Sequence, residues 1–185
     1  MDPLERVRVS ERSPDERSDI RGPVLHLYPA YRCAYAGYLD VIMDPLERVR
    51  VSFAKQGLMT TLGAKLGAIS PGAVEIILFP SPAISQQHGF VHAGAVSSIA
   101  DSAAGYASLS LVPSGTSILT AEFKINLVAP AVGERIIARG RVVKPGRTLT
   151  LAQTDVFAES KGKEKLIAVL TATMMSIEGR DGIED

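Results

Sequence analysis

The sequence predicts an α+β domain in which an antiparallel sheet wraps around one long central helix. Three observations lead to this fold class: a helix of mostly small residues over 93–109, one strand-like stretch before it, and four strand-like stretches after it at hairpin spacing. With 185 residues, 46% of them hydrophobic, the chain is long enough to form one such domain with a sizeable core.

The segment before the central helix is predicted to hold one helix and one strand. A helix is expected from Pro45 to about Thr60, because Asp44 is a good N-cap and Pro45 suits the first helical position. Glycines and a Ser-Pro-Gly sequence within 63–72 indicate turns. Residues 73–79 (AVEIILF) are rich in β-branched side chains and are predicted to form a strand.

The central helix is unusual because most of its residues between Ala93 and Leu109 are Ala, Gly or Ser. Small side chains let neighbouring backbones approach closely, so this helix is predicted to be buried. The four later strands are expected at 120–128, 135–143, 148–158 and 166–177. In the first of these, one face of the alternation holds Ala121, Phe123, Ile125 and Leu127, and the other holds Thr120, Glu122, Lys124 and Asn126.

The first 42 residues differ in character from the rest of the chain. The decapeptide Met1–Ser10 recurs identically at Met43–Ser52, and one such pair is too little for a solenoid. Four of the five tyrosines and the single cysteine, Cys33, also precede Met43. We interpret 1–42 as an N-terminal extension outside the fold, 43–178 as the domain and 179–185 as a C-terminal tail. The alternative is that the extension is a regulatory or partner-binding arm.

Composition excludes several classes of function. Twenty basic and 20 acidic residues cancel, which argues against nucleic acid or an anionic membrane as the main partner. No apolar run approaches the roughly 18 residues that a membrane span needs. One cysteine cannot form an internal disulfide, which predicts a reducing, cytoplasmic location. Three histidines and one cysteine show no zinc-ligand spacing, so no metal and no cofactor are expected.

The stretch 86–101 carries the pattern that indicates chemistry. A polar loop punctuated by Gly89 leads into the central helix, whose first amides, those of Ala93 and Gly94, lie at the positive end of the helix dipole. Such donors are suited to polarising a carbonyl oxygen. Asp101 follows about two and a half turns into the helix, where an unpartnered carboxylate is costly. We therefore predict that Asp101 is functional rather than merely structural.

This stretch resembles the hotdog-fold thioesterases, specifically the branch of phenylacetate-pathway and related small acyl-CoA thioesterases. The family pattern is Asn/Gln-x-x-Gly-x-x-His-Gly-Gly followed, seven residues after the last glycine, by Asp or Glu. Every spacing is kept here, by Gln86, Gly89, His92, Ala93, Gly94 and Asp101. Ala93 replaces the first glycine of the pair, which keeps the N–H but not the tolerance for positive φ. The resemblance covers roughly 52–177.

The resemblance implies a hotdog fold and the hydrolysis of an acyl-CoA thioester. Asp101 would act as general base or nucleophile, the amides of Ala93 and Gly94 would hold the oxyanion, and Gln86 would position the water or the carbonyl. Thr120 matches a position where the family often has a hydroxyl near the carboxylate. In such enzymes the loop and the Asp come from different subunits, so a homodimer or a dimer of dimers is expected.

Substrate contacts are assigned to His92 and Gly89 in the loop, and to Lys144 and Arg147 in a turn that would meet the CoA phosphates. Two alternatives stay open at this point. His92 could instead make a structural hydrogen bond that shapes the turn, and Arg147 could be simply solvated. A different function, a non-catalytic domain that binds acyl-CoA as a sensor, is the alternative to hydrolysis.

Overall fold

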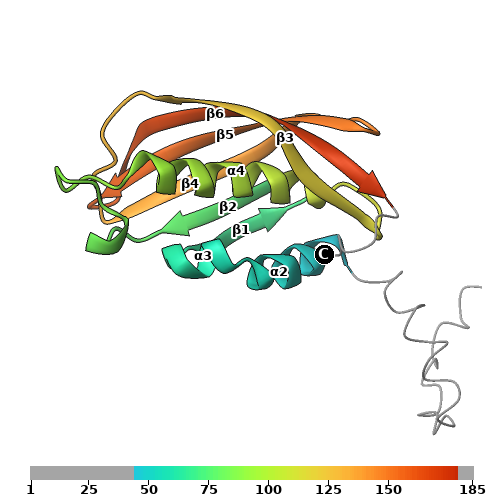
Figure 1. Ribbon diagram of the computed structural model, residues 1–185, viewed down its shortest axis with the longest axis horizontal. Helices are drawn as coiled ribbons and strands as arrows, with labels where there is room; N and C mark the ends of the chain where they lie inside the picture. Colours follow the sequence, from blue (N-terminus) through green and yellow to red (C-terminus); the bar gives the residue numbers. More distant parts are fainter. Residues whose placement is uncertain (1–43, 179–185) are drawn as a thin grey trace, which may run out of the picture. The chain divides into compact units, whose positions relative to one another are not determined.

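The computed structural model describes residues 44–178 (Figure 1). The expectations for the extension 1–42, for Cys33 and for the tail 179–185 lie outside the described residues. In chain order the elements are α2 (Pro45–Lys55), α3 (Gly57–Leu62), β1 (Lys65–Ser70), β2 (Ala73–Leu78), the 3-10 helix η3 (Pro82–Ile84), α4 (Ala93–Leu109), β3 (Thr116–Leu127), β4 (Arg135–Lys144), β5 (Leu149–Ser160) and β6 (Lys163–Glu178).

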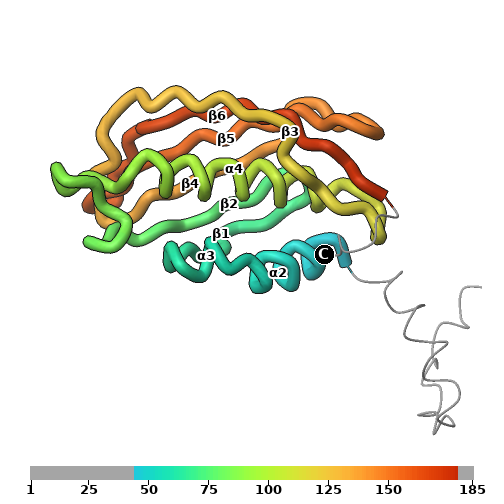
Figure 2. Tube along the Cα trace, viewed as in Figure 1, coloured from blue at the N-terminus to red at the C-terminus, as the bar shows by residue number. Residues whose placement is uncertain are grey.

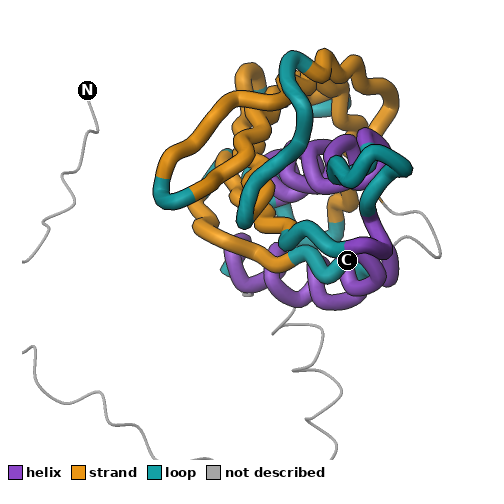
Figure 3. The backbone as a smooth tube through the Cα atoms, turned by 90° about the vertical axis from the view of Figure 1, so that its left-hand side faces the viewer, coloured by secondary structure: helices purple, strands orange, loops and turns teal. Residues whose placement is uncertain are grey.

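The strands form one antiparallel sheet of six, in the order β1-β2-β4-β5-β6-β3. The sheet curls around α4, as the end-on view in Figure 3 shows, and α2 and α3 lie beside the β1 side of the fold (Figure 1). The predicted α+β architecture, a sheet wrapped around one long helix, is therefore confirmed, and α4 has the bounds that the sequence predicts.

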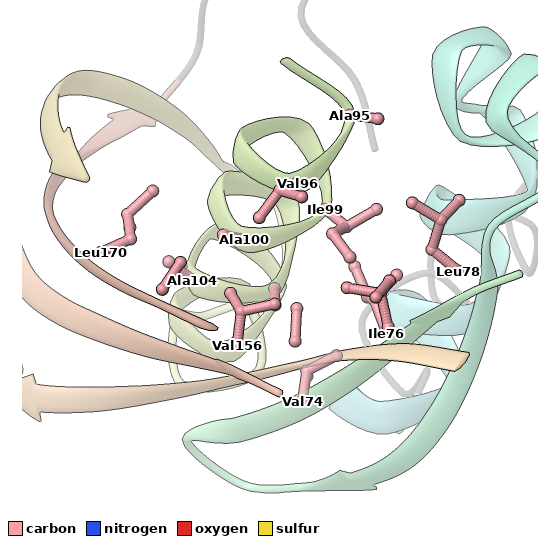
Figure 4. Close-up of a cluster of buried hydrophobic side chains, with 14 of the residues drawn as sticks. Val74, Ile76, Leu78, Ala95, Val96, Ile99, Ala100, Ala104, Val156 and Leu170 are labelled. Atoms are coloured by element: carbon pink, nitrogen blue, oxygen red, sulfur yellow. The ribbon is translucent and has the colours of Figure 1, made fainter. Parts of the chain in front are cut away.

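The core lies between α4 and the concave face of the sheet. Ala100, Ala103 and Ala104 of α4 have no exposed surface. Figure 4 shows Ala100 and Ala104 among side chains from both layers, including Ile76 of β2 and Leu170 of β6. Small side chains on the helix thus let the sheet close around it, as the composition of 93–109 predicts. Each buried aliphatic side chain contributes roughly 1.5–3 kcal/mol relative to exposure.

Three local predictions need correction. The helix expected to reach Thr60 is broken at Gln56, whose backbone is extended (φ −74, ψ 104), so α2 and α3 are separate helices. The stretch 63–72, read as turns, contains the edge strand β1. The glycine within the strand, Gly67, and the two that flank it make the sequence resemble turns, because pairing with β2 rather than local propensity holds the strand in place.

The third correction concerns the faces of β3. A bulge between Thr120 and Glu122 shifts the alternation, so Thr120 pairs with Met174 and Phe123 pairs with Ala172. Both of these β6 partners are buried against α4. Thr120 therefore lies on the helix side of the sheet, not on the opposite face from Phe123 as strict alternation predicts.

Helix α2 is fixed to the C-terminal end of α4 by a buried arginine. The Arg48 guanidinium donates hydrogen bonds to the carbonyl oxygens of Leu109 (2.5 Å), Val112 (2.8 Å) and Pro113 (2.7 Å). These carbonyls end the helix or follow it, where no intrahelical donors remain. The next residue, Val49, has no exposed surface. Arg48 and Val49 thus set the position of α2 relative to α4.

Among the helices of residues 44–178, none is long and apolar enough to cross a membrane.

Candidate active site

The loop before α4 is held by its own backbone. The amide of Gln86 donates to the Phe90 carbonyl (2.8 Å), and the amide of Gly89 donates to the Gln86 carbonyl (2.9 Å). Gly89 has φ +82, a conformation that disfavours residues with a Cβ. An isolated bridge between Ser85 and Val91 closes the loop. The turn therefore explains why the thioesterase pattern has a glycine at position 89.

His92 is the N-cap of α4. Its Nδ1 accepts a hydrogen bond from the Gly94 amide (2.9 Å), and its carbonyl accepts from the amides of Ala95 (3.0 Å) and Val96 (3.2 Å). A Cβ at position 94 would lie 3.0 Å from Nδ1, so glycine there keeps room for the cap. The geometry agrees with the structural alternative for His92, the hydrogen bond that shapes the turn.

The two amides assigned to the oxyanion hole are therefore not equivalent. The Gly94 amide is already engaged by His92, whereas the Ala93 amide has no acceptor among residues 44–178. Within the same range Lys161 is the one non-glycine residue with positive φ, so Ala93 is not strained. Alanine in place of the family's glycine leaves a free donor at the exposed start of α4.

This end of α4 opens onto a cavity of about 550 Å³. Gln86, Phe90 and Ala93 line one side of it, and the segment from Leu127 to Ala131 lines the other. The lining is mostly apolar, with Gln86, Gln87 and the start of α4 as its polar groups. A cavity of this character suits part of an organic ligand whose one polar group meets the helix start.

Asp101 lies half-buried in the middle of α4, with one partner from the sheet. The Thr120 hydroxyl donates a hydrogen bond to Asp101 Oδ1 (2.8 Å). Burial raises the pKa of the Asp101 carboxyl above its usual 3.8, and the hydrogen bond from Thr120 lowers it by a smaller amount. A carboxylate with a raised pKa is a stronger base, and the hydrogen bond from Thr120 holds one of its two oxygens.

A second pocket, of about 240 Å³, opens beside Asp101. Its walls come from α4, from β3 through Ile118 and Thr120, from α2 through Ser52 and Lys55, and from Gln56 just after α2. The α2 residues are absent from the sequence-based site. They lie some 50 residues before Asp101 and belong to no spacing motif, so only the packing of α2 on α4 reveals them.

The structure does not bring all the predicted residues together within one chain. Ala93 and Asp101 are eight positions apart on α4, which corresponds to about 12 Å along the helix axis. The exposed Lys144–Arg147 turn joins β4 to β5 at the opposite end of α4 from the Gln86 loop (Figure 2). Thr120 and Asp101 form one group, and Gln86, Gly89, His92 and Ala93 form another.

Strand β3 lies at an edge of the sheet and carries exposed apolar side chains. Phe123 is 46% exposed and Leu127 52% exposed, and Val128 just beyond the strand is 59% exposed. Unpaired strand edges with apolar side chains favour pairing with another chain. This edge runs between the two groups of site residues.

Comparison with known proteins places this chain in a family. The thioesterase superfamily model matches residues 88–165. The chain is also similar to a thioesterase family protein from Silicibacter pomeroyi of known structure, with 49% identity and a TM-score of 0.72, over 73% of this chain and 99% of the other. The protein belongs to the thioesterase superfamily. Thioester hydrolysis is its general activity.

More distant structures share the fold. A thioesterase from Haemophilus influenzae is 20% identical (TM-score 0.64, over 69% of this chain and 87% of the other). A protein from the phenylacetic acid degradation operon of E. coli is 17% identical (TM-score 0.66, over 74% of this chain and 95% of the other). The predicted hotdog fold and the resemblance to thioesterases of the phenylacetate type are both confirmed. No curated protein matches the chain.

Proposed function

We propose that this protein hydrolyses acyl-CoA thioesters to the free acid and CoA, with Asp101 as the catalytic carboxylate. The observation that carries the proposal is the half-buried Asp101, whose pKa burial raises and whose Oδ1 accepts a hydrogen bond from Thr120. Thr120 holds one oxygen of the carboxylate, and Asp101 lines the pocket beside it. A positioned carboxylate of raised basicity is what proton removal from water requires.

In the proposed reaction Asp101 takes a proton from water as the water oxygen attacks the thioester carbon. The carbonyl oxygen becomes an oxyanion and accepts a hydrogen bond from the Ala93 amide at the start of α4. The C–S bond then breaks, and the CoA thiolate takes up the proton that Asp101 holds. Direct attack by Asp101 on the carbonyl, through an anhydride that water then hydrolyses, is the nucleophilic variant of the same scheme.

A single chain cannot perform this reaction, because Ala93 and Asp101 lie about 12 Å apart along α4 and both must act within hydrogen-bond distance of one carbonyl. We infer that the Gln86–Ala93 loop of one subunit meets Asp101 and Thr120 of its partner. The exposed apolar edge of β3 supports this dimer, since it offers both an unpaired strand and side chains to bury. Association into a dimer of dimers is part of the same proposal.

The decisive experiment is Asp101→Asn, which keeps the shape and removes the base. The kcat for acyl-CoA should fall by roughly two to four decades, the usual contribution of general acid–base catalysis. The matched control is Asp155→Asn, a carboxylate of β5 hydrogen-bonded by Gln153, which should retain wild-type activity. Release of free thiol measures both rates. An Asp101→Asn protein that folds and still hydrolyses acyl-CoA at the wild-type rate would refute the assignment.

Thermal melting of the same variant checks that the loss is chemical. Folding raises the pKa of Asp101, so its stabilising contribution is complete below the carboxyl's usual pKa and is lost as pH rises through the folded-state value. Asp101→Asn should therefore melt at or above the wild-type temperature at neutral pH, with the difference closing in acid. If the wild type binds acyl-CoA and releases no thiol, the sensor function takes the place of hydrolysis.

A further inference from the structure

Among the residues that line the pocket beside Asp101, one is basic: the exposed Lys55, at the last position of α2. No carboxylate of residues 44–178 forms an ion pair with Lys55. The rest of the wall combines polar groups, such as Ser52 and Gln56, with apolar ones, such as Leu109 and Ile118. A free cation thus lines the pocket that also holds the proposed catalytic carboxylate.

The wall that carries Lys55 is held in place on both sides. Before it, Arg48 binds the carbonyls at the end of α4, and the Phe53 ring packs edge-on against Tyr106, with ring centroids 5.7 Å apart. After it, Gln56 breaks the helix and its Oε1 accepts a hydrogen bond from the Ser102 hydroxyl (3.4 Å). The end of α2 is therefore a fixed part of the pocket, which limits where the Lys55 ammonium can reach.

The pocket, of about 240 Å³, suits a small group beside the thioester rather than a whole CoA molecule. The size of this pocket also decides which anion Lys55 can bind there. In an acyl-CoA the whole pantetheine arm separates the thioester from the nearest phosphate. A carbonyl beside Asp101 and a CoA phosphate cannot both occupy this pocket. The counter-charge for Lys55 therefore belongs to the acyl group.

We propose that the acyl group of the substrate is short and ends in a carboxylate, which Lys55 binds while the thioester carbonyl lies at Asp101. This inference rests on the proposed acyl-CoA hydrolysis and specifies its substrate class: the CoA monothioesters of short dicarboxylic acids. Lys55 is a specificity-determining residue in this scheme, and the polar rim from α2 accommodates the hydrated end of the acyl chain.

The test compares glutaryl-CoA with pentanoyl-CoA, which have the same five-carbon chain with and without a terminal carboxylate. Wild-type kcat/KM should favour glutaryl-CoA. Lys55→Met keeps the aliphatic stem and removes the charge, so kcat/KM for glutaryl-CoA should fall by about tenfold to a hundredfold, as for loss of a hydrogen bond to a charged group. The value for pentanoyl-CoA should stay within about threefold. Arg50→Met, on the same helix but paired with Glu47, is the control and should change neither.

Each other result overturns the inference. If Lys55→Met raises KM equally for both substrates, Lys55 contacts the CoA part that they share. If the ratio of the two kcat/KM values is unchanged, Lys55 does not recognise the terminal carboxylate. The two proposals fail separately. If pentanoyl-CoA is hydrolysed, Asp101→Asn abolishes that hydrolysis and Lys55→Met leaves selectivity unchanged, only the carboxylate inference is wrong. If the wild type releases thiol from neither substrate, the carboxylate inference is refuted, and a panel of longer and aromatic acyl-CoA esters decides whether acyl-CoA hydrolysis fails as well.

Discussion

The two halves of the site, the start of α4 and its middle, are built in different ways. At the start, the loop hydrogen bonds and the His92 cap mostly join residues between Ile84 and Val96; the exception is the Val91 amide, which donates to the Ala131 carbonyl (3.2 Å). In the middle, Asp101 depends on Thr120 from β3, on the distant helix α2 and on burial by the sheet. The first half is a local structure that a short sequence pattern encodes, and the second exists only when the whole domain has folded.

This difference has a functional consequence. The local half supplies donors and is open to solvent, with Ala93 exposed, whereas the tertiary half supplies a base whose pKa burial has raised. In one chain, the amide donors at the start of α4 lie too far from Asp101 for both to act on the same carbonyl. Pairing two chains would complete two sites at once, because a two-fold axis brings each half against its counterpart. The variants described below test the two halves separately, by removing or weakening one group in each.

Of the predictions that follow, the largest effect is expected from removing the Ala93 amide. Ala93→Pro deletes that N–H, proline is well tolerated at the first helical position, and His92 already has the extended backbone that a residue before proline prefers (φ −61, ψ 139). The kcat should fall by roughly two to three decades, as for loss of one oxyanion donor. Ala93→Ser, which keeps the amide, is the control and should remain active; equal loss in both variants would assign the effect to the side chain.

Mixing inactive variants tests whether the halves come from different chains. Asp101→Asn and Ala93→Pro chains, unfolded together and refolded at equal amounts, should recover about a quarter of wild-type activity. Half of the dimers would be mixed, and each mixed dimer has one intact site of its two. Thiol release after refolding measures this recovery. No recovery from well-folded mixtures would mean that each site is built within one chain.

A smaller effect is expected from Thr120→Val, which removes the hydrogen bond to Asp101 with little change of shape. Because that bond lowers the carboxyl's pKa, its loss should raise the pKa further. The acid limb of the kcat/KM profile should move to higher pH, with about a tenfold loss at neutral pH that narrows in alkaline buffer. Thr171→Val, an exposed threonine of β6, should leave the profile unchanged. An unmoved acid limb in Thr120→Val would separate Thr120 from the titrating group.

The smallest effect concerns the exposed turn at the far end of α4. Arg147→Ala should raise KM for acyl-CoA by a few-fold at low salt, as for loss of one solvent-exposed charge contact, with kcat little changed. Lys163→Ala, in the β5–β6 hairpin, is the matched loss of a surface cation and should leave KM unchanged. A KM that is independent of both Arg147 and ionic strength would show that the turn is only solvated.

How well the sequence predicts each element depends on how far apart in the chain its contacting residues lie. The bounds of α4 follow from a run of small residues, and the Gln86-to-Asp101 spacing follows from one loop and one helix. Strand β1 and the break at Gln56 were mispredicted, because their neighbours in space rather than in sequence hold them. The bulge after Thr120 belongs to the same class, since it shifts the alternation without any glycine or proline to mark it.

By itself the sequence determined the fold class, the helix that carries Asp101 and the local half of the site, because periodicity, capping and glycine turns act over a few residues. Only the tertiary structure decided that Gly94 is engaged while Ala93 is free, that Thr120 turns toward Asp101, and that α2 brings Lys55 to the same pocket. These features depend on which distant segments pack together. Their physical cause is burial against these distant segments, and the spacing of residues along the chain does not reveal burial.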